Sequence, residues 1–179
     1  MNSKQILKFW FHPDTIPFQF AQNDGFDQLI HEQYSDIHRQ ASQCELWHWR
    51  ETAEGRLAEI IILDQFSRNL YRNSARAFAQ DALALSLAQE AIQLKLDQTL
   101  PSEQRAFLYM PFMHSESKII HQHALRLFTD LANANSLEFE IRHKAIIDRF
   151  GHYPHRNDVL GRVSTAEELE FLTQPNSRF

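Results

Sequence analysis

The chain has 179 residues, of which 43% are hydrophobic and 23% are charged, and its formal net charge is −5 at pH 7. This composition is typical of a soluble globular protein, and the acidic balance gives no general attraction to nucleic acid or to an anionic membrane surface. Because the longest aliphatic run is Ile60–Leu63 and the single cysteine is Cys44, we expect no membrane span, no internal disulfide and a cytoplasmic location.

The predicted elements are helices joined by short loops. Valine occurs only at positions 159 and 163 and glycine only four times, whereas a β-rich fold of this length would normally use more of both. Hydrophobic spacing, capping residues and prolines predict helices over residues 3–11, 23–41, 52–71, 75–96, 102–111, 115–132, 136–150 and 164–172. The predicted N-terminal caps are Ser3, Thr52, Ser74, Ser115 and Ser136, and a capping box from Ser164 opens the last helix. Gly151 is predicted to close the 136–150 helix.

This pattern predicts an all-α protein with a single domain over residues 1–179, about seven to nine helices and no sheet. Small residues lie on an apolar face in Phe78–Ile92 and in His123–Ala134, as they do in tetratricopeptide helices. Because no 34-residue period holds along the chain, we expect stacked antiparallel helical hairpins with degenerate repeats.

The first polar motif follows the nearly all-apolar stretch Leu57–Leu63 in the predicted 52–71 helix. Asp64, Arg68 and Arg72 are four residues apart and share one stripe of that helix, so Asp64 can form an ion pair with Arg68. Together with Asn69, these residues are interpreted either as part of an anion pocket or as a paired, purely structural network.

The second polar motif contains His114, Ser115 and Glu116 at a predicted helix start. A histidine and a carboxylate there could act as a general base with its orienting group, or as two metal ligands. Equally, Ser115 can cap the helix while Glu116 interacts with its positive end. The spacing of His114 and Glu116 is too short to specify a metal.

The third polar motif is a loop that leads into the N-terminus of the last predicted helix, where free amides and the helix dipole favour an anion. So many directional donors indicate a loop that either binds a ligand or is hydrogen-bonded into place. On the preceding helix, His143 shares a face with apolar residues and is predicted to point inward. The polar residues of the loop are Arg149, His152, His155, Arg156, Asn157 and Arg162.

Six segments of the chain, taken in order, resemble those of a bacterial and eukaryotic family, the domain of unknown function nine-two-four. Together they span nearly the whole chain. The resemblance implies an all-helical, tetratricopeptide-like fold and implies no reaction. Ser67 stands where proline is usual in that family, and His152 stands where arginine is common. The segments that carry the resemblance are residues 6–11, 62–69, 75–79, 109–116, 149–157 and 160–165.

The leading hypothesis is a basic pocket between helices that binds a small anionic molecule or an acidic peptide end. It rests on the 13 arginines and 5 lysines that make up the 18 basic residues of an acidic chain. No cofactor is predicted. The predicted ligand-binding residues are Asp64, Arg68, Asn69, Arg72, Arg149, Arg156, Asn157 and Arg162.

Two further hypotheses stay open at this point. In a hydrolase, His114 or His155 would be the general base and Glu116 would orient it. In a structural or adaptor protein, the polar motifs would form a buried network and a partner would bind elsewhere. A metal-dependent version of the hydrolase would use His114, Glu116, His143 and His155 as ligands.

Overall fold

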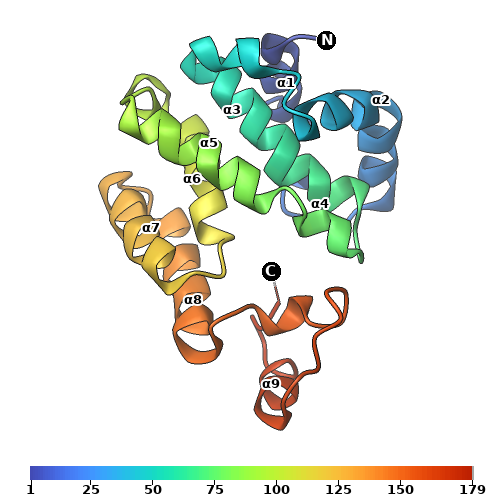
Figure 1. Cartoon of the computed structure of the whole chain (residues 1–179), viewed down its shortest axis with the longest axis vertical. Coiled ribbons are helices and arrows are strands. Elements are labelled where there is room, and N and C mark those ends of the chain that lie inside the picture. Colours follow the sequence, from blue (N-terminus) through green and yellow to red (C-terminus); the bar gives the residue numbers. More distant parts are fainter. Residues whose placement is uncertain (179) are drawn as a thin grey trace. The chain divides into compact units, whose positions relative to one another are not determined.

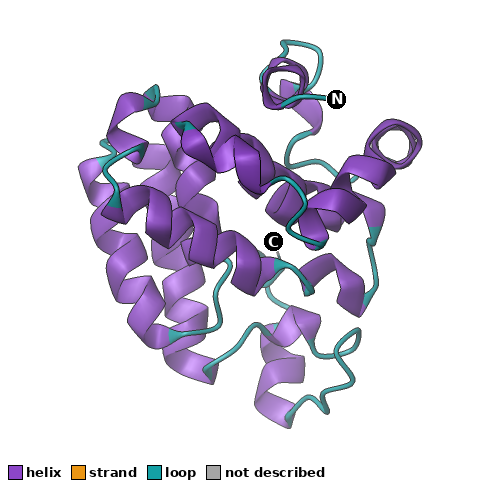
Figure 2. Cartoon of the chain, turned by 45° about the horizontal axis from the view of Figure 1, so that its top comes forward, coloured by secondary structure: helices purple, strands orange, loops and turns teal. Residues whose placement is uncertain are grey.

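The computed structural model describes residues 1–178, and this part of the chain consists of helices, turns and loops without a strand (Figure 1, Figure 2). The all-helical fold class expected from the sequence is confirmed. None of the helices in the described residues is long and apolar enough to cross a membrane. The α-helices are α1 (Ser3–Trp10), α2 (Asp24–Ser42), α3 (Ala53–Ile61), α4 (Ser67–Leu70), α5 (Asp81–Gln93), α6 (Ser102–Met113), α7 (Lys118–Asp130), α8 (Ala134–Phe150) and α9 (Ala166–Phe171).

The chain divides into two compact units, which are described separately. Unit 1 comprises Met1–Arg72 and Arg76–Pro111, and unit 2 comprises Asn73–Ala75 and the chain from Phe112 onward. The single domain expected from the sequence stays a prediction. Shorter helical turns complete both units: η1 (Ile16–Phe18), η2 (Trp47–Glu51), η3 (Ile62–Phe66), η4 (Ala75–Phe78), η5 (Asp97–Thr99) and η6 (Pro154–Arg156).

Helix α3 lies at the centre of unit 1, where it contacts α1, α5 and η2. Every residue from Leu57 to Ser67 is buried. A helix buried on all sides must satisfy its polar side chains inside the protein, and here the fully buried Glu59 pairs with Arg50 at 2.7 Å. The helix therefore fixes the positions of the polar side chains that follow it.

The predicted 52–71 helix is confirmed, with one internal irregularity. After α3 the backbone widens into the π-helical turn η3 and then continues as α4. Such turns are rare and are often found at functional sites. Asp64 lies within η3 and is fully buried.

Aromatic side chains pack around the end of α1 in unit 1. Trp10 is fully buried, and its ring centroid lies 5.6 Å from that of Phe66 and 5.8 Å from that of Phe107. The two contacts are tilted and edge-on, which are the arrangements that aromatic quadrupoles prefer. Trp10 is thus core, as its apolar spacing predicts, whereas Phe20, later in the same aromatic-rich segment, is 75% exposed.

The start of α3 requires a glycine. Thr52 caps the helix as predicted, because its hydroxyl accepts a 3.0 Å hydrogen bond from the Gly55 amide. A Cβ atom on Gly55 would lie 1.9 Å from the carbonyl oxygen of Trp49. No other residue fits at this corner between η2 and α3 without moving the backbone.

Four predicted capping residues are wrong by one to three positions. In each case a neighbouring side chain accepts the hydrogen bond from the amide of the first helical turn, so it satisfies a backbone donor that the predicted residue does not reach. The actual caps are Asn2, Ser117, Asn133 and Thr165 in place of Ser3, Ser115, Ser136 and Ser164.

The predicted 75–96 helix is wrong at both ends. Its first residues form the separate turn η4, and α5 begins only at Asp81 and ends at Gln93. The guanidinium of Arg76 lies 3.8 Å from the centre of the Tyr71 ring, a contact that holds the turn in place. Lys95 adopts a positive φ of 58°, which ends the helical path.

Unit 2 is built on a helical hairpin. Helices α7 and α8 pack side by side and are joined by only three residues, 131–133 (Figure 1). Helix α8 ends at Gly151, whose φ of 76° is the left-handed conformation predicted for it. Ile146, Ile147 and Tyr153 form a small buried core next to the hairpin. The tetratricopeptide-like repeat stays a prediction.

Candidate functional site

The first polar motif forms an ionic network inside unit 1. Arg68 lies 3.2 Å from the Asp64 carboxylate, which confirms the ion pair expected from the four-residue spacing. The same guanidinium donates two hydrogen bonds, of 3.1 and 3.2 Å, to Asp81 at the start of α5. The charge of Arg68 is thus compensated by carboxylates from two elements.

Asn69 and Arg72, from the same motif, converge on Asp27 of α2. The Asn69 amide donates a 2.8 Å hydrogen bond to this carboxylate, and Arg72 forms a forked pair with it at 2.5 and 2.8 Å. A bidentate contact of this kind fixes both side chains and uses the donors that an anion would need. The contact ties α2 to the end of α4.

The second polar motif holds a loop of unit 2. Both oxygens of Glu116 accept hydrogen bonds from Arg162, at 3.0 and 2.6 Å, and one of them also accepts from the Tyr153 amide at 2.9 Å. These contacts outweigh the effect of burial and lower the pKa of Glu116. The Glu116 carboxylate thus ties Arg162 and the Tyr153 backbone to the segment before α7.

The arginines of the third motif lie in two different environments. Arg149 is 47% exposed in its side chain and pairs with Glu167 of α9 at 2.7 Å. Arg156 is buried: its guanidinium lies 4.5 Å from the centre of the Tyr153 ring and donates a 3.1 Å hydrogen bond to the His114 carbonyl. Asn157, also buried, donates to the Ser164 hydroxyl at 3.1 Å. Both environments hold the loop in place.

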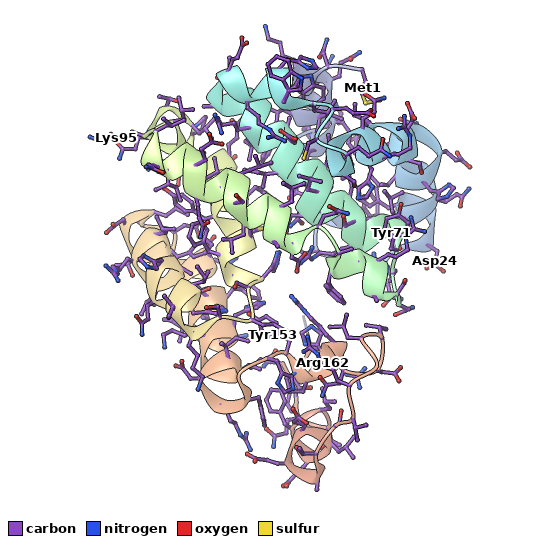
Figure 3. The ribbon with its side chains drawn as sticks, in the orientation of Figure 1. Met1, Asp24, Tyr71, Lys95, Tyr153 and Arg162 are labelled. Carbon is purple, nitrogen blue, oxygen red and sulfur yellow. The ribbon has the colours of Figure 1, made fainter. Side chains whose placement is uncertain are left out.

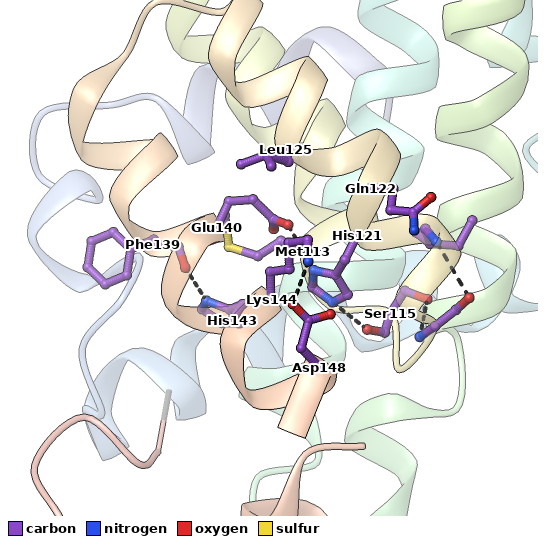
Figure 4. A network of polar contacts seen from close by, with 12 residues as sticks. Met113, Ser115, His121, Gln122, Leu125, Phe139, Glu140, His143, Lys144 and Asp148 are labelled. Atoms are coloured by element: carbon purple, nitrogen blue, oxygen red, sulfur yellow. Dashed lines mark hydrogen bonds and ion pairs between the residues drawn. The ribbon is translucent and has the colours of Figure 1, made fainter. Parts of the chain in front are cut away.

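A buried histidine–carboxylate pair lies between α7 and α8, and the sequence did not predict it (Figure 4). His121 and Glu140 are both fully buried, and Nδ1 of the histidine lies 2.8 Å from Oε1 of the carboxylate. Nε2 lies 2.8 Å from the Ser115 carbonyl oxygen, which can only accept, so Nε2 carries a hydrogen. Burial is the main cause that raises the pKa of Glu140, and the hydrogen bond with His121 opposes it.

Tyr153 connects this pair to the rest of the third motif. Its hydroxyl donates a 2.5 Å hydrogen bond to the Met113 carbonyl and lies 3.2 Å from Nε2 of His121. Tyr153 and Arg162 both belong to the segment after α8 (Figure 3). A hydrogen-bonded chain thus runs from Glu140 through His121 to Tyr153.

His143 points inward, as predicted, and is held neutral. Burial is the main cause that lowers its pKa to about 3, and the neighbouring His114, His121 and His155 act in the same direction. Its Nδ1 lies 2.8 Å from the Phe139 carbonyl and donates to it (Figure 4). Within residues 1–178, no three side chains of the types His, Cys, Asp and Glu are arranged to hold a metal ion.

A small polar pocket lies within unit 1, where the sequence analysis placed no site. Its volume is about 170 Å³, and it is formed by α2, the end of α4 at Tyr71 (Figure 3) and η4. Among the described residues that line it none is acidic, whereas two are arginines. We refer to it as the polar pocket, and it is lined by His38, Arg39, Ser42, Gln43, Tyr71, Arg76, Ala79 and Gln80.

His38 presents a defined tautomer in the polar pocket. Ser67 donates its hydroxyl hydrogen to the Leu63 carbonyl at 2.6 Å, so Nε2 of His38, 2.7 Å away, must donate to the Ser67 oxygen. The other ring nitrogen, Nδ1, is therefore an acceptor. Burial, followed by the charge of Arg76, lowers the pKa of His38 to about 4, and the ring is neutral at pH 7.

Sequence reasoning missed the polar pocket because its residues come from separate segments. His38 and Arg39 lie on α2, more than 30 positions before Arg76, and neither belongs to a polar motif. Arg76 was the one available signal, since it lies in one of the segments that resemble the family. The structure places the predicted residues Arg68 and Arg72 in unit 1, and Arg149, Arg156 and Arg162 in unit 2.

Comparison with known proteins gives a family and a fold. The model of a family described as bacterial protein of unknown function (DUF924) matches residues 6–176. A solved structure, described as a protein of unknown function from Agrobacterium tumefaciens (ATU0120), is 38% identical, with a TM-score of 0.89. The match covers 95% of this chain and 96% of that one. The search of curated proteins gives no match.

Proposed function

The chain belongs to the bacterial family of proteins of unknown function DUF924, and we propose that it binds a small anionic molecule in the polar pocket of unit 1. The observation that supports this most is the lining itself, which combines two guanidinium groups with neutral hydrogen-bonding side chains and no carboxylate among the described residues. Arginine forks are well suited to carboxylate and phosphate oxygens.

The two pocket arginines are held in defined orientations. Arg76 stacks on the Tyr71 ring at 3.8 Å, and Arg39 donates hydrogen bonds to Asp36 and Gln43 at 3.0 and 2.8 Å. A guanidinium that is already oriented loses less conformational entropy when it binds a ligand. Arg76 and His38 line the same pocket, and the charge of Arg76 is, after burial, a cause of the lowered pKa of His38.

The volume limits the size of the ligand. At about 170 Å³ the polar pocket is smaller than the roughly 300–1,000 Å³ of sites for drug-sized molecules. A phosphate ion or a short organic acid therefore fits better than a nucleotide or a peptide. The acceptor nitrogen of His38 favours an anion that also carries a hydroxyl group, which could donate to it.

Isothermal titration with inorganic phosphate and with a hydroxy acid such as malate tests the proposal. We expect saturable binding that Arg76→Gln weakens about tenfold, because a charge-assisted fork is lost. Arg126→Gln, an exposed arginine of α7 in unit 2, is the control and should bind as wild type. Absence of heat with both ligands, or equal affinity in both variants, would overturn the proposal.

For the three polar motifs themselves, we infer a structural role. Arg68, Arg72 and Arg162 each form ion pairs with carboxylates at 3.2 Å or less. These three side chains are 22%, 28% and 35% exposed, so their pairs are partly shielded from water. Arg39 of the polar pocket also pairs with a carboxylate, Asp36 at 3.0 Å, but its side chain is 54% exposed and an exposed pair of this kind is weak. This favours the hypothesis in which the motifs are a network that fixes helix ends and loops, while the polar pocket carries the binding.

A further inference from the structure

A second pocket of a different chemical kind lies in unit 1, between α1, η1 and the first turns of α2. Its volume is about 430 Å³, within the range of known small-molecule sites. Most of its surface is apolar and comes from Phe9, Phe18, Phe26 and Leu29. We refer to it as the aromatic pocket.

The phenylalanine rings of the aromatic pocket form a row. Phe26 stacks with Phe9 at a centroid distance of 6.1 Å and an angle of 11°, and with Phe18 at 5.4 Å and 19°. Phe9 and Phe18 are only partly buried, so part of their surface still faces solvent. Covering them with a flat apolar group would remove apolar area from water and add favourable ring contacts.

The loop that closes one side of the aromatic pocket is held by its own hydrogen bonds. The amides of Thr15 and Phe18 bond back along the loop at 2.8 and 2.9 Å, and the Gln19 side chain donates to the Trp10 carbonyl at 2.8 Å. Thr15 is buried. A pocket formed in advance costs little ordering entropy when a ligand binds.

The rim of the aromatic pocket includes the ammonium group of Lys8, in the last turn of α1. Across residues 1–178, Lys8 forms no ion pair, whereas Asp14, a carboxylate on the same rim, lies 3.5 Å from His12 and is 90% exposed in its side chain, where water screens its charge. An ammonium group beside an apolar surface complements a ligand with an apolar body and a negative end. From this combination, we propose that the aromatic pocket binds a planar aromatic carboxylate.

The test uses naphthalene-2-carboxylate as the probe and the uncharged naphthalene-2-carboxamide as its comparator, both measured by isothermal titration. We expect the carboxylate to bind more tightly than the amide. Lys8→Gln should weaken the carboxylate about threefold to fivefold and leave the amide unchanged, since a solvent-exposed ion pair contributes little more. Phe18→Ala should weaken both ligands, by about tenfold, because it removes apolar contact area.

A matched control is Lys4→Gln, which removes an exposed lysine one turn earlier on α1 that does not line the pocket. It should bind both probes as wild type does. Equal weakening by Lys4→Gln and Lys8→Gln, or equal affinity of wild type for the two probes, would overturn the proposed carboxylate site. Arg76→Gln should leave naphthalene-2-carboxylate binding unchanged, so failure of this proposal is distinguishable from failure of the polar pocket.

Discussion

The polar residues of the two units are neutralised in different ways. In unit 1, Arg68 is paired with Asp81 at 3.1 Å and Arg72 with Asp27 at 2.5 Å. In unit 2, the groups around Tyr153 include the His121–Glu140 pair and the neutral His143. The comparison teaches that the first network is held by pairs of charged groups, whereas in the second burial lowers the pKa of His143 and raises that of Glu140.

The largest expected effect comes from breaking the buried pair of unit 2. His121→Leu leaves Glu140 fully buried beside an apolar group, and should lower the free energy of unfolding by about 3 to 5 kcal/mol in urea denaturation. The double variant His121→Leu with Glu140→Leu removes both polar groups and should recover most of that loss. A double variant as unstable as the single one would show that the pair is not the source of the effect.

The next largest effect is the pH dependence. His143 and His38 have pKa values of about 3 and about 4 when folded, against about 6.5 when unfolded. As pH falls below 6.5, the unfolded chain binds protons that the folded chain does not, so each histidine lowers the free energy of unfolding by about 1.4 kcal/mol per pH unit, until its folded pKa is reached.

Urea denaturation at pH 7, 6 and 5 measures this dependence. His143→Gln and His38→Gln should each reduce the slope of unfolding free energy against pH by about the contribution of one histidine. The substitution His123→Gln is the control, because His123 is exposed on α7. An unchanged slope in the first two variants would contradict the lowered pKa values.

A smaller effect is expected for the ion pair that holds the loop of unit 2. Glu116→Gln removes the carboxylate that accepts from Arg162 and from the Tyr153 amide, and should cost about 1 to 2 kcal/mol of unfolding free energy. Because the pKa of Glu116 is lowered, its contribution is present above the usual glutamate range and is lost as pH falls through the folded pKa. A double-mutant cycle with Arg162→Gln measures the coupling energy between the two side chains. A coupling energy of zero would show that the ion pair does not stabilise the fold.

The smallest effect is expected at the surface. Arg149→Gln removes a pair with Glu167 in which the two side chains are 47% and 61% exposed, and the unfolding free energy should change by less than about 1 kcal/mol. This variant marks the lower end of the comparison between buried and exposed charges. A loss of unfolding free energy as large as that of Glu116→Gln would show that Arg149 makes a stronger interaction than this exposed ion pair.

Much of the fold could be predicted from the sequence because its signals are local. Thr52 caps α3 and Gly151 closes α8 as expected, since a cap acts over three or four residues. The Asp64–Arg68 pair was predicted for the same reason, because it spans one turn of helix. The errors at the other helix starts came from several capping residues standing close together, where tertiary contacts decide which one is used.

The candidate site was less predictable because its contacts are not local. Arg72 pairs with Asp27 and Arg162 with Glu116, 45 and 46 positions away. A motif shows which residues are polar but does not show which distant carboxylate takes their charge. The polar pocket was missed for this reason, and the aromatic pocket because its phenylalanines are typical of a core as much as of a ligand site.

The π-helical turn η3 has a consequence for how chain length can vary among relatives. A turn of this kind contains one residue more than a regular α-helical turn, so it corresponds to a single-residue insertion in the 53–70 segment. Because the π-turn absorbs the extra residue, deleting one residue within η3 would restore a regular helix and leave Arg68, Asn69 and Arg72 on the side that faces Asp81 and Asp27. A deletion in the regular turns of the 53–70 segment would instead rotate these side chains by about 100° around the helix axis. Single-residue deletions in this segment should therefore be tolerated in η3 and excluded from the regular turns beside it.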